Sequence, residues 1–113
     1  MNGKTCKFQG TKPMHFVVLF DDDPKSDPKI RARHMPAHLA FLQAHATLIK
    51  AAGPLRSGKD PAGGLWLVTA DTPQDVERLI RADPFWPTGL RRGWRILEWV
   101  RVFENGSALI NEP

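Results

Sequence analysis

Three stretches of the chain carry apolar residues on both faces and predict buried strands. They run from Met14 to Phe20, from Leu65 to Ala70 and from Trp94 to Phe103. A strand with one face in water alternates apolar and polar residues, whereas these stretches stay apolar across successive positions. A fourth, shorter strand is expected at 54–57, followed by a turn-rich loop over 58–64.

A helical period marks the segment from Arg31 to Pro54, the longest of its kind in the chain. Its apolar residues recur at alternating spacings of four and three, which places one stripe on a helix: Met35, Leu39, Leu42, Ala46 and Ile49. A neighbouring stripe consists of His34, His38, Phe41, His45 and Leu48. It therefore contains three of the four histidines. The segment therefore sets titratable side chains beside a seam that we expect to be buried.

Proline and glycine set the predicted bounds of this helix. Pro36 lacks a backbone N–H and its ring clashes with the preceding turn, so we expect a break there. A short turn through Arg33 would precede a second helix over 36–51. Gly53 is expected to end that helix in the left-handed conformation, and Pro54 cannot continue it.

A further helix follows the strand that ends at Ala70. Thr72 is a typical N-cap, Pro73 stands at the first helical position, and Asp75 adds an acid to the first turn. We expect its buried face to comprise Val76, Leu79 and Ile80. Residues 82–87, with two prolines, interrupt it.

The resulting order, β-α-β-β-α-β, predicts an α+β protomer of the ferredoxin-like type. In that fold an antiparallel sheet carries both helices on one face. Two helices cover only one face, yet the strands are apolar on both. We therefore expect a homodimer in which the exposed sheet faces of two copies pack together.

Composition indicates one ordinary globular domain over residues 14–104, between a polar leader (1–13) and a short tail (105–113). No apolar run approaches the ~20 residues that span a bilayer, so we expect no membrane partner. Cys6 is the only cysteine and cannot form an intrachain disulfide, which favours a cytoplasmic setting.

The net charge of +4 is spread along the chain rather than gathered in a block. The densest cluster, Arg91-Arg92-Gly93-Trp94-Arg95, is most simply a solvated loop before a strand. Basic and aromatic residues do not interleave as they do where bases stack, so we expect no nucleic-acid partner. An anionic small molecule is the more natural partner for scattered arginines.

Metal binding is an alternative role for the histidines. His34 and His38 are four residues apart, but Met35 stands where a zincin has glutamate, and His45 lies two turns away. The aspartates at 21–23 lack the spacing of a calcium loop and predict a solvated loop. We expect no metal, and no organic cofactor either, because no phosphate-cradling glycine motif is present.

Short motifs of the chain resemble the YciI-like (YCII-related) family, small proteins that form a dimeric α/β barrel from ferredoxin-like protomers. The motifs are Arg31…Pro36-Ala37-His38-Leu39…Leu42, then Ala52-Gly53-Pro54, then Ala82-Asp83-Pro84-Phe85 with Gly89-Leu90. The resemblance covers about residues 14–103. It implies an active-site pair of a helix histidine and an aspartate, here His38 and Asp83. One branch of the family eliminates chloride from a chlorinated hydroxyhydroquinone, and most members have no assigned substrate.

The implied pair has the side chains that proton transfer requires. Imidazole exchanges protons near neutral pH, and a carboxylate beside it fixes its tautomer. The structural alternatives are a surface or interface histidine and an aspartate that only caps the helix starting at Pro84. Arg31 falls where many family members carry arginine, whereas Met35 replaces the second arginine that some members have.

These residues predict an enzyme that acts on a small oxygenated cyclic or aromatic substrate by elimination, isomerisation or hydrolysis. His38 would act as general acid/base, Asp83 would orient it, and Arg31 would steer an anionic group. Three further residues are candidates for the substrate pocket: His15, Phe85 and Trp86. The alternative is a non-catalytic dimeric module that binds a small molecule in the same pocket.

Overall fold

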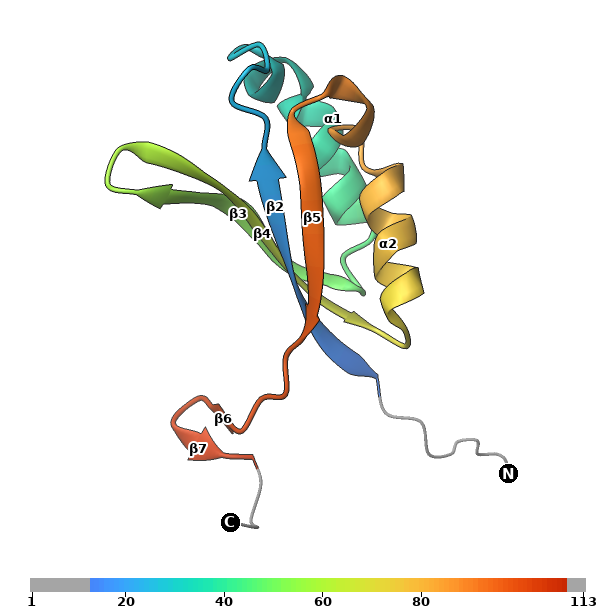
Figure 1. Cartoon of the computed structure of the whole chain (residues 1–113). Coiled ribbons are helices and arrows are strands. Elements are labelled where there is room, and N and C mark those ends of the chain that lie inside the picture. Colours follow the sequence, from blue (N-terminus) through green and yellow to red (C-terminus); the bar gives the residue numbers. More distant parts are fainter. Residues whose placement is uncertain (1–12, 110–113) are drawn as a thin grey trace.

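The computed structural model describes residues 13–109 of the 113-residue chain (Figure 1). In chain order its elements are β2 (Met14–Asp22), α1 (Ile30–Ala44), β3 (Ile49–Ser57), β4 (Asp60–Ala70), α2 (Pro73–Ala82), the 3-10 helix η1 (Trp86–Thr88), β5 (Arg91–Glu98), β6 (Phe103–Glu104) and β7 (Ser107–Ala108). The expectations for the leader, Cys6 and the last four residues lie outside the described residues.

Four strands form one antiparallel sheet in the order β3-β4-β2-β5, and β6 and β7 form a separate small hairpin. Figure 1 shows α1 and α2 side by side on one face of the sheet. This strand order, with both helices on one face, is the ferredoxin-like arrangement. The predicted fold class of the protomer is therefore confirmed.

The core fills the space between this face of the sheet and the helices. Alternate residues of the two central strands point into it: Phe16, Val18, Phe20, Trp66 and Val68. Helix α2 contributes the predicted residues Val76, Leu79 and Ile80. Its N-cap is also as predicted, because Thr72 Oγ1 accepts a hydrogen bond of 3.1 Å from the backbone N–H of Asp75.

The opposite face of the sheet, called the open face below, carries an apolar stripe across three strands. Its members are Val17, Leu19, Leu65 and Leu67, which are half-buried, and Leu97, which is 40% exposed. The strand register sets Val17 between Leu67 and Leu97. The described part of the chain leaves this stripe without a covering layer, as the strand pattern predicts.

The predicted break at Pro36 is wrong, because α1 is one helix from Ile30 to Ala44 with Pro36 inside it. Proline removes one hydrogen bond, the one to the carbonyl of Ala32. Ala32 and Pro36 are both exposed, so water can solvate the freed carbonyl. The helix also turns a different side to the core than the apolar stripe predicts: His38 is buried, whereas Leu39 is 50% exposed.

The predicted helix end at Ala51 is also wrong. The helix ends at Ala44, and residues 49–57 form β3, in which Gly53 has no positive φ. Pairing with β4 outweighs the helical period: Leu48 accepts a hydrogen bond of 2.8 Å from Thr69, and Ile49 is buried opposite Val68. Local periodicity carries no information about that pairing.

Two other predicted segments also have different bounds in the structure. β4 begins at Asp60, since Ser57 pairs with Asp60 across a turn in which Gly58 has φ +62°. The predicted loop over 58–64 is therefore mostly strand. The last strand occupies 91–98 rather than 94–103, and beyond it the chain continues into the small hairpin β6–β7 (Figure 1).

Replacing Gly63 by alanine should lower the free energy of unfolding by about 1–3 kcal/mol. Gly63 lies in β4 with φ +91°, and an added Cβ would lie 2.1 Å from the carbonyl oxygen of Phe20. Gly93→Ala is the matched control, because nothing lies within 4 Å of a Cβ there. Urea denaturation measures both variants, and equal stabilities would show that Gly63 is not constrained.

Candidate functional site

The site is built around a hydrogen bond between two residues that are 45 positions apart in sequence. Nδ1 of His38, in the middle of α1, lies 2.8 Å from Oδ1 of Asp83, which directly follows α2. The side chain of His38 is 9% exposed and that of Asp83 is fully buried. Because an ionised carboxylate only accepts hydrogen bonds, Nδ1 carries the proton and donates it.

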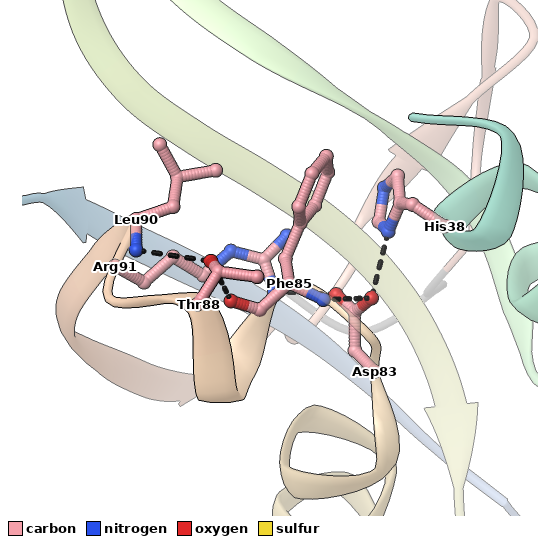
Figure 2. Close-up of polar contacts among 6 residues, drawn as sticks. All are labelled: His38, Asp83, Phe85, Thr88, Leu90 and Arg91. Atoms are coloured by element: carbon pink, nitrogen blue, oxygen red, sulfur yellow. Dashed lines mark hydrogen bonds and ion pairs between the residues drawn. The ribbon is translucent and has the colours of Figure 1, made fainter. Parts of the chain in front are cut away.

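Asp83 has a partner for each of its carboxylate oxygens (Figure 2). Oδ1 accepts from His38 and, at 3.1 Å, from the backbone N–H of Phe85. Oδ2 lies 2.5 Å from Nη1 of Arg91, the first residue of β5. No helix begins at Pro84, because η1 starts at Trp86 with Phe85 at its N-cap position, so the expected N-cap role of Asp83 is wrong. Its bond to the N–H of Phe85 closes a turn instead, and the carboxylate is held from three sides.

The loop from Asp83 to Arg91 is braced by its own hydrogen bonds. Thr88 Oγ1 donates to the carbonyl of Phe85 at 2.6 Å and accepts from the N–H of Leu90 at 3.2 Å (Figure 2). Gly89, with φ +83°, ends η1 in the left-handed region that glycine adopts without strain. These contacts fix the segment that presents both Asp83 and Arg91 to His38.

Arg91 reaches the site because of an irregularity in the sheet. The register between β2 and β5 shifts at Asp21 and Asp22, so that Asp22 lies opposite Arg91 while Asp21 lies opposite Gly93. Such a bulge reverses which side chains face which side of a sheet. It turns Arg91 to the helix-covered side, where its side chain is 6% exposed, and leaves Arg92 in solvent.

The ionised form of Asp83 is favoured in spite of its burial. Burial alone would raise the pKa of Asp83, but the hydrogen bond from His38, the charge of Arg91 and the N–H of Phe85 outweigh it. The pKa of Asp83 therefore lies below its ordinary value. Burial also lowers the pKa of Arg91, against the attraction of Asp83, but an arginine remains charged at any physiological pH.

This shift predicts how acid affects stability. Asp83 has a lower pKa in the folded state than in the unfolded chain, where it is about 3.9. Its ionised form therefore stabilises the fold above about pH 4, and that contribution is lost as the pH falls through the lower folded-state pKa. Urea denaturation between pH 7 and 3 measures the loss. Asp83→Asn should show a shallower decline with acid, and an unchanged decline would contradict the assignment.

A small cavity of about 120 Å³ lies beside the pair, between α1 and the sheet. Its polar lining consists of Asp22, Arg31, His38 and Arg91. Its apolar walls include Phe20, Met35, Leu42, Leu65 and Trp66. Within the described residues, Nε2 of His38 makes no hydrogen bond, and it is therefore the imidazole nitrogen that can meet a ligand in this cavity.

Larger hollows lie elsewhere on the described surface, but they do not include His38 or Asp83. One of about 680 Å³ lies at the start of α2, beside His45 and Asp75. Another of about 390 Å³ lies beside His15 on the open face. Size alone does not identify a reactive site, and the 120 Å³ cavity is the one of the three that includes the buried histidine.

The structure places two of the predicted pocket residues at the cavity or against His38. Arg31 lines the cavity, and its Nη2 donates to Asp22 Oδ2 at 2.9 Å. Phe85 is fully buried, and its ring packs against the imidazole of His38 at 4.3 Å between centroids. Phe85 therefore supports the histidine from behind rather than contacting a ligand directly.

The other two predicted pocket residues lie away from the site. Trp86 packs edge-on against Trp94, with 4.6 Å between ring centroids. His15 lies on the open face, where Nδ1 meets Thr69 Oγ1 at 3.2 Å and Nε2 meets Nη2 of Arg101 at 2.8 Å. An arginine only donates, so Nε2 of His15 accepts, and His15 takes part in a separate contact that attaches the C-terminal segment to the sheet.

Two residues of the site were assigned to solvated loops in the sequence: Asp22 and Arg91. A period-two pattern extended back from Trp94 and Ile96 would turn Arg92, not Arg91, toward the helices. The bulge reverses this, and nothing in the local sequence signals it. The helical period likewise underestimates the burial of His38, because it places this residue beside the apolar stripe and not on the side of the helix that faces the core.

The described residues hold neither a cluster of metal-ligand side chains nor a membrane-spanning helix. Across residues 13–109, no three His, Cys, Asp or Glu side chains gather where they could share a metal ion. Neither helix in this range is long and apolar enough to cross a membrane.

Comparison with known proteins adds a family and a fold neighbour. The YCII-related domain matches residues 14–100 of the chain. A similar solved structure is the 5-chloro-2-hydroxyhydroquinone dehydrochlorinase of Burkholderia phenoliruptrix, in complex with 2,5-dihydroxybenzoquinone. It is 26% identical, covers 76% of this chain and 93% of its own, and superposes with a TM-score of 0.63. No curated protein sequence matches the chain significantly.

Proposed function

The chain belongs to the YCII-related family, and from this premise we propose that it is an enzyme that moves a proton on a small oxygenated ring. His38 is the general acid/base, and Asp83 orients it. The family membership and the likeness to a dehydrochlorinase support an enzyme of this family. Elimination is the favoured reaction, because the dehydrochlorinase performs one, with isomerisation and hydrolysis as the other candidates.

The observation that carries the proposal is the contact between His38 and Asp83 at the edge of a small cavity. With its proton on Nδ1 donated to Asp83, His38 presents the lone pair of Nε2 to a ligand. Nε2 can take a proton from a ring hydroxyl or an acidic C–H. In an elimination, the electron pair left behind forms a new π bond while a leaving group such as chloride departs with its own bond electrons.

The size of the cavity limits the substrate to one ring at most. A cavity of roughly 150 Å³ accommodates benzene, and the space beside His38 is smaller, at about 120 Å³, so a substituted ring would extend past its mouth. Apolar walls would contact the ring faces, and Asp22, Arg31, His38 and Arg91 supply the polar lining. Arg31 would steer an anionic oxygen, although its bond to Asp22 offsets part of its charge.

A substrate screen tests the proposal. The native protein is incubated with chlorinated and unchlorinated dihydroxy- and trihydroxybenzenes, with chloride release and ultraviolet spectra as readouts. We expect turnover of at least one chlorinated ring. Tight binding by calorimetry without turnover of any ring would favour the alternative, a dimeric binding module that uses the same cavity. Neither turnover nor binding would contradict both.

We also propose that a second copy of the chain covers the open face. The apolar stripe of Val17, Leu19, Leu65, Leu67 and Leu97 matches itself in a face-to-face pair, and such a pair of sheets would form the dimeric α/β barrel. A cytoplasmic setting without nucleic-acid or membrane partners remains our expectation from composition.

Placing a charge at the centre of the stripe should prevent this association. Leu67→Arg would desolvate a charge in an apolar interface, so we expect the variant to be monomeric where the native chain is dimeric. Light scattering measures the mass of each. Gln43→Arg is the control, because it adds the same charge at an exposed position of α1, which covers the opposite face of the sheet. A native chain that stays monomeric at high concentration would contradict the proposal.

A further inference from the structure

Besides its ion pair with Asp83, the guanidinium of Arg91 is surrounded by aromatic rings. Its guanidinium carbon lies 3.8 Å from the ring centroid of Phe20, with the rings of Phe85 and Trp66 at 5.4 and 5.5 Å. A guanidinium stacked on an aromatic face has a fixed plane and direction. Arg91 is therefore a buried and rigidly oriented cation at the wall of the cavity.

Most of its donors are uncommitted. A guanidinium has five N–H groups, and one hydrogen bond to Asp83 is the side-chain bond that Arg91 makes within the described residues. Within the described residues, the side-chain nitrogen that is both fully enclosed and without a hydrogen-bond partner belongs to Arg101, not to Arg91. The nitrogens of Arg91 that make no hydrogen bond are therefore not fully enclosed. Arg91 lines the same cavity as His38, which is where these N–H groups can meet a ligand.

We propose that Arg91 binds the substrate oxygen on which negative charge develops, and that it is a catalytic residue in this sense. The inference rests on the proposed function. When Nε2 of His38 takes a proton, the electron pair left on the ring is shared with a ring oxygen as a phenolate or enolate. The free N–H groups of Arg91, whose side chain is largely buried, donate to that oxygen.

The charges around the cavity are consistent with this role. Arg31 is bonded to Asp22, and Asp83 accepts from His38 as well as from Arg91. Of the two arginines at the cavity, Arg91 is the more buried, with 6% of its side chain exposed against 34% for Arg31. A hydrogen bond to a developing oxyanion is worth more where water competes less, so Arg91 is the stronger candidate.

Binding of 4-nitrophenol tests the inference without turnover. Its phenol and phenolate forms differ in visible absorption, so the pH at which the bound probe ionises can be read directly. We expect the native protein to bind the phenolate in preference, which moves the ionisation of the bound probe to lower pH. Arg91→Met should weaken phenolate binding about 10- to 100-fold, whereas nitrobenzene, which lacks the hydroxyl, should bind both proteins within about twofold.

Two further variants keep the test decisive. Arg92→Met, at an exposed neighbour, should leave phenolate binding unchanged, and Arg91→Lys should retain part of it. Where Arg91→Met does not fold, Asp83→Asn is compared with Asp83→Asn/Arg91→Met, which leaves no unpaired carboxylate. Equal phenolate binding with and without Arg91 would overturn the inference, as would a native protein with no preference for phenolate. Phenolate binding through Arg91 in a protein without turnover would instead refute only the proposed function.

Discussion

Replacing His38 by glutamine is expected to lower turnover by about 10²–10⁴-fold while the fold stays intact. The glutamine amide can still donate a hydrogen bond to Asp83, but it cannot exchange a proton near neutral pH. Substrate binding should change little, because the apolar walls and the two arginines at the cavity would still contact the substrate. Steady-state kinetics would then show a fall in kcat with KM nearly unchanged.

His34→Gln is the matched control, since His34 lies one turn earlier on the same helix and outside the cavity lining. Its kcat should stay within a factor of about two. Circular dichroism of both variants shows whether the helix is intact. A His38→Gln protein with native kcat would rule out His38 as the acid/base, and the contact with Asp83 would then be a structural one.

Replacing Asp83 by alanine should lower the free energy of unfolding by about 3–5 kcal/mol. The change leaves Arg91 buried without an opposite charge, and it removes acceptors from His38 and from the N–H of Phe85. Catalytic activity should fall as well, because nothing then holds the imidazole in its orientation. Asp83→Asn should be milder, since its amide oxygen can still accept from His38.

A double variant separates the charge from the packing. Asp83→Ala/Arg91→Met removes both charges, so it should be more stable than Asp83→Ala alone. Asp22→Asn serves as the control at a partly exposed pair, where we expect a loss of about 0–1 kcal/mol. Urea denaturation at pH 7 measures the series. If Asp83→Ala lowers the free energy of unfolding by less than about 1 kcal/mol, the buried charge of Arg91 does not need this carboxylate as its partner.

The fold was predictable because its signals are local. The central strands and α2 could be read from hydrophobic runs, an N-cap at Thr72 and a proline at the first helical position. Where α1 ends was not predictable: the period continues to Ile49, but pairing with β4 takes that residue into the sheet. Long-range pairing decides such boundaries, and a single sequence does not display it.

The site was predictable only in part. Nothing local relates His38 to Asp83, and the family resemblance alone suggested that they form a pair. In the structure, Nδ1 of His38 lies 2.8 Å from Oδ1 of Asp83. Arg91 could not be found in this way, because its direction depends on a bulge opposite Asp22. The sequence instead suggested Trp86, because it closely follows Asp83, and His15, because a titratable residue on the first strand is a candidate before the direction of its side chain is known.

The nitrogen NMR spectrum of His38 tests most directly whether this histidine is the reacting group of a one-ring site. Resonances are assigned by comparison with His38→Gln, and 2,5-dihydroxybenzoquinone, the ligand of the similar dehydrochlorinase, is then added. We expect the Nε2 resonance of His38 to shift on binding while the proton stays on Nδ1, hydrogen-bonded to Asp83. A ligand that binds and leaves the Nε2 resonance unchanged would contradict the assignment of this cavity as the active site.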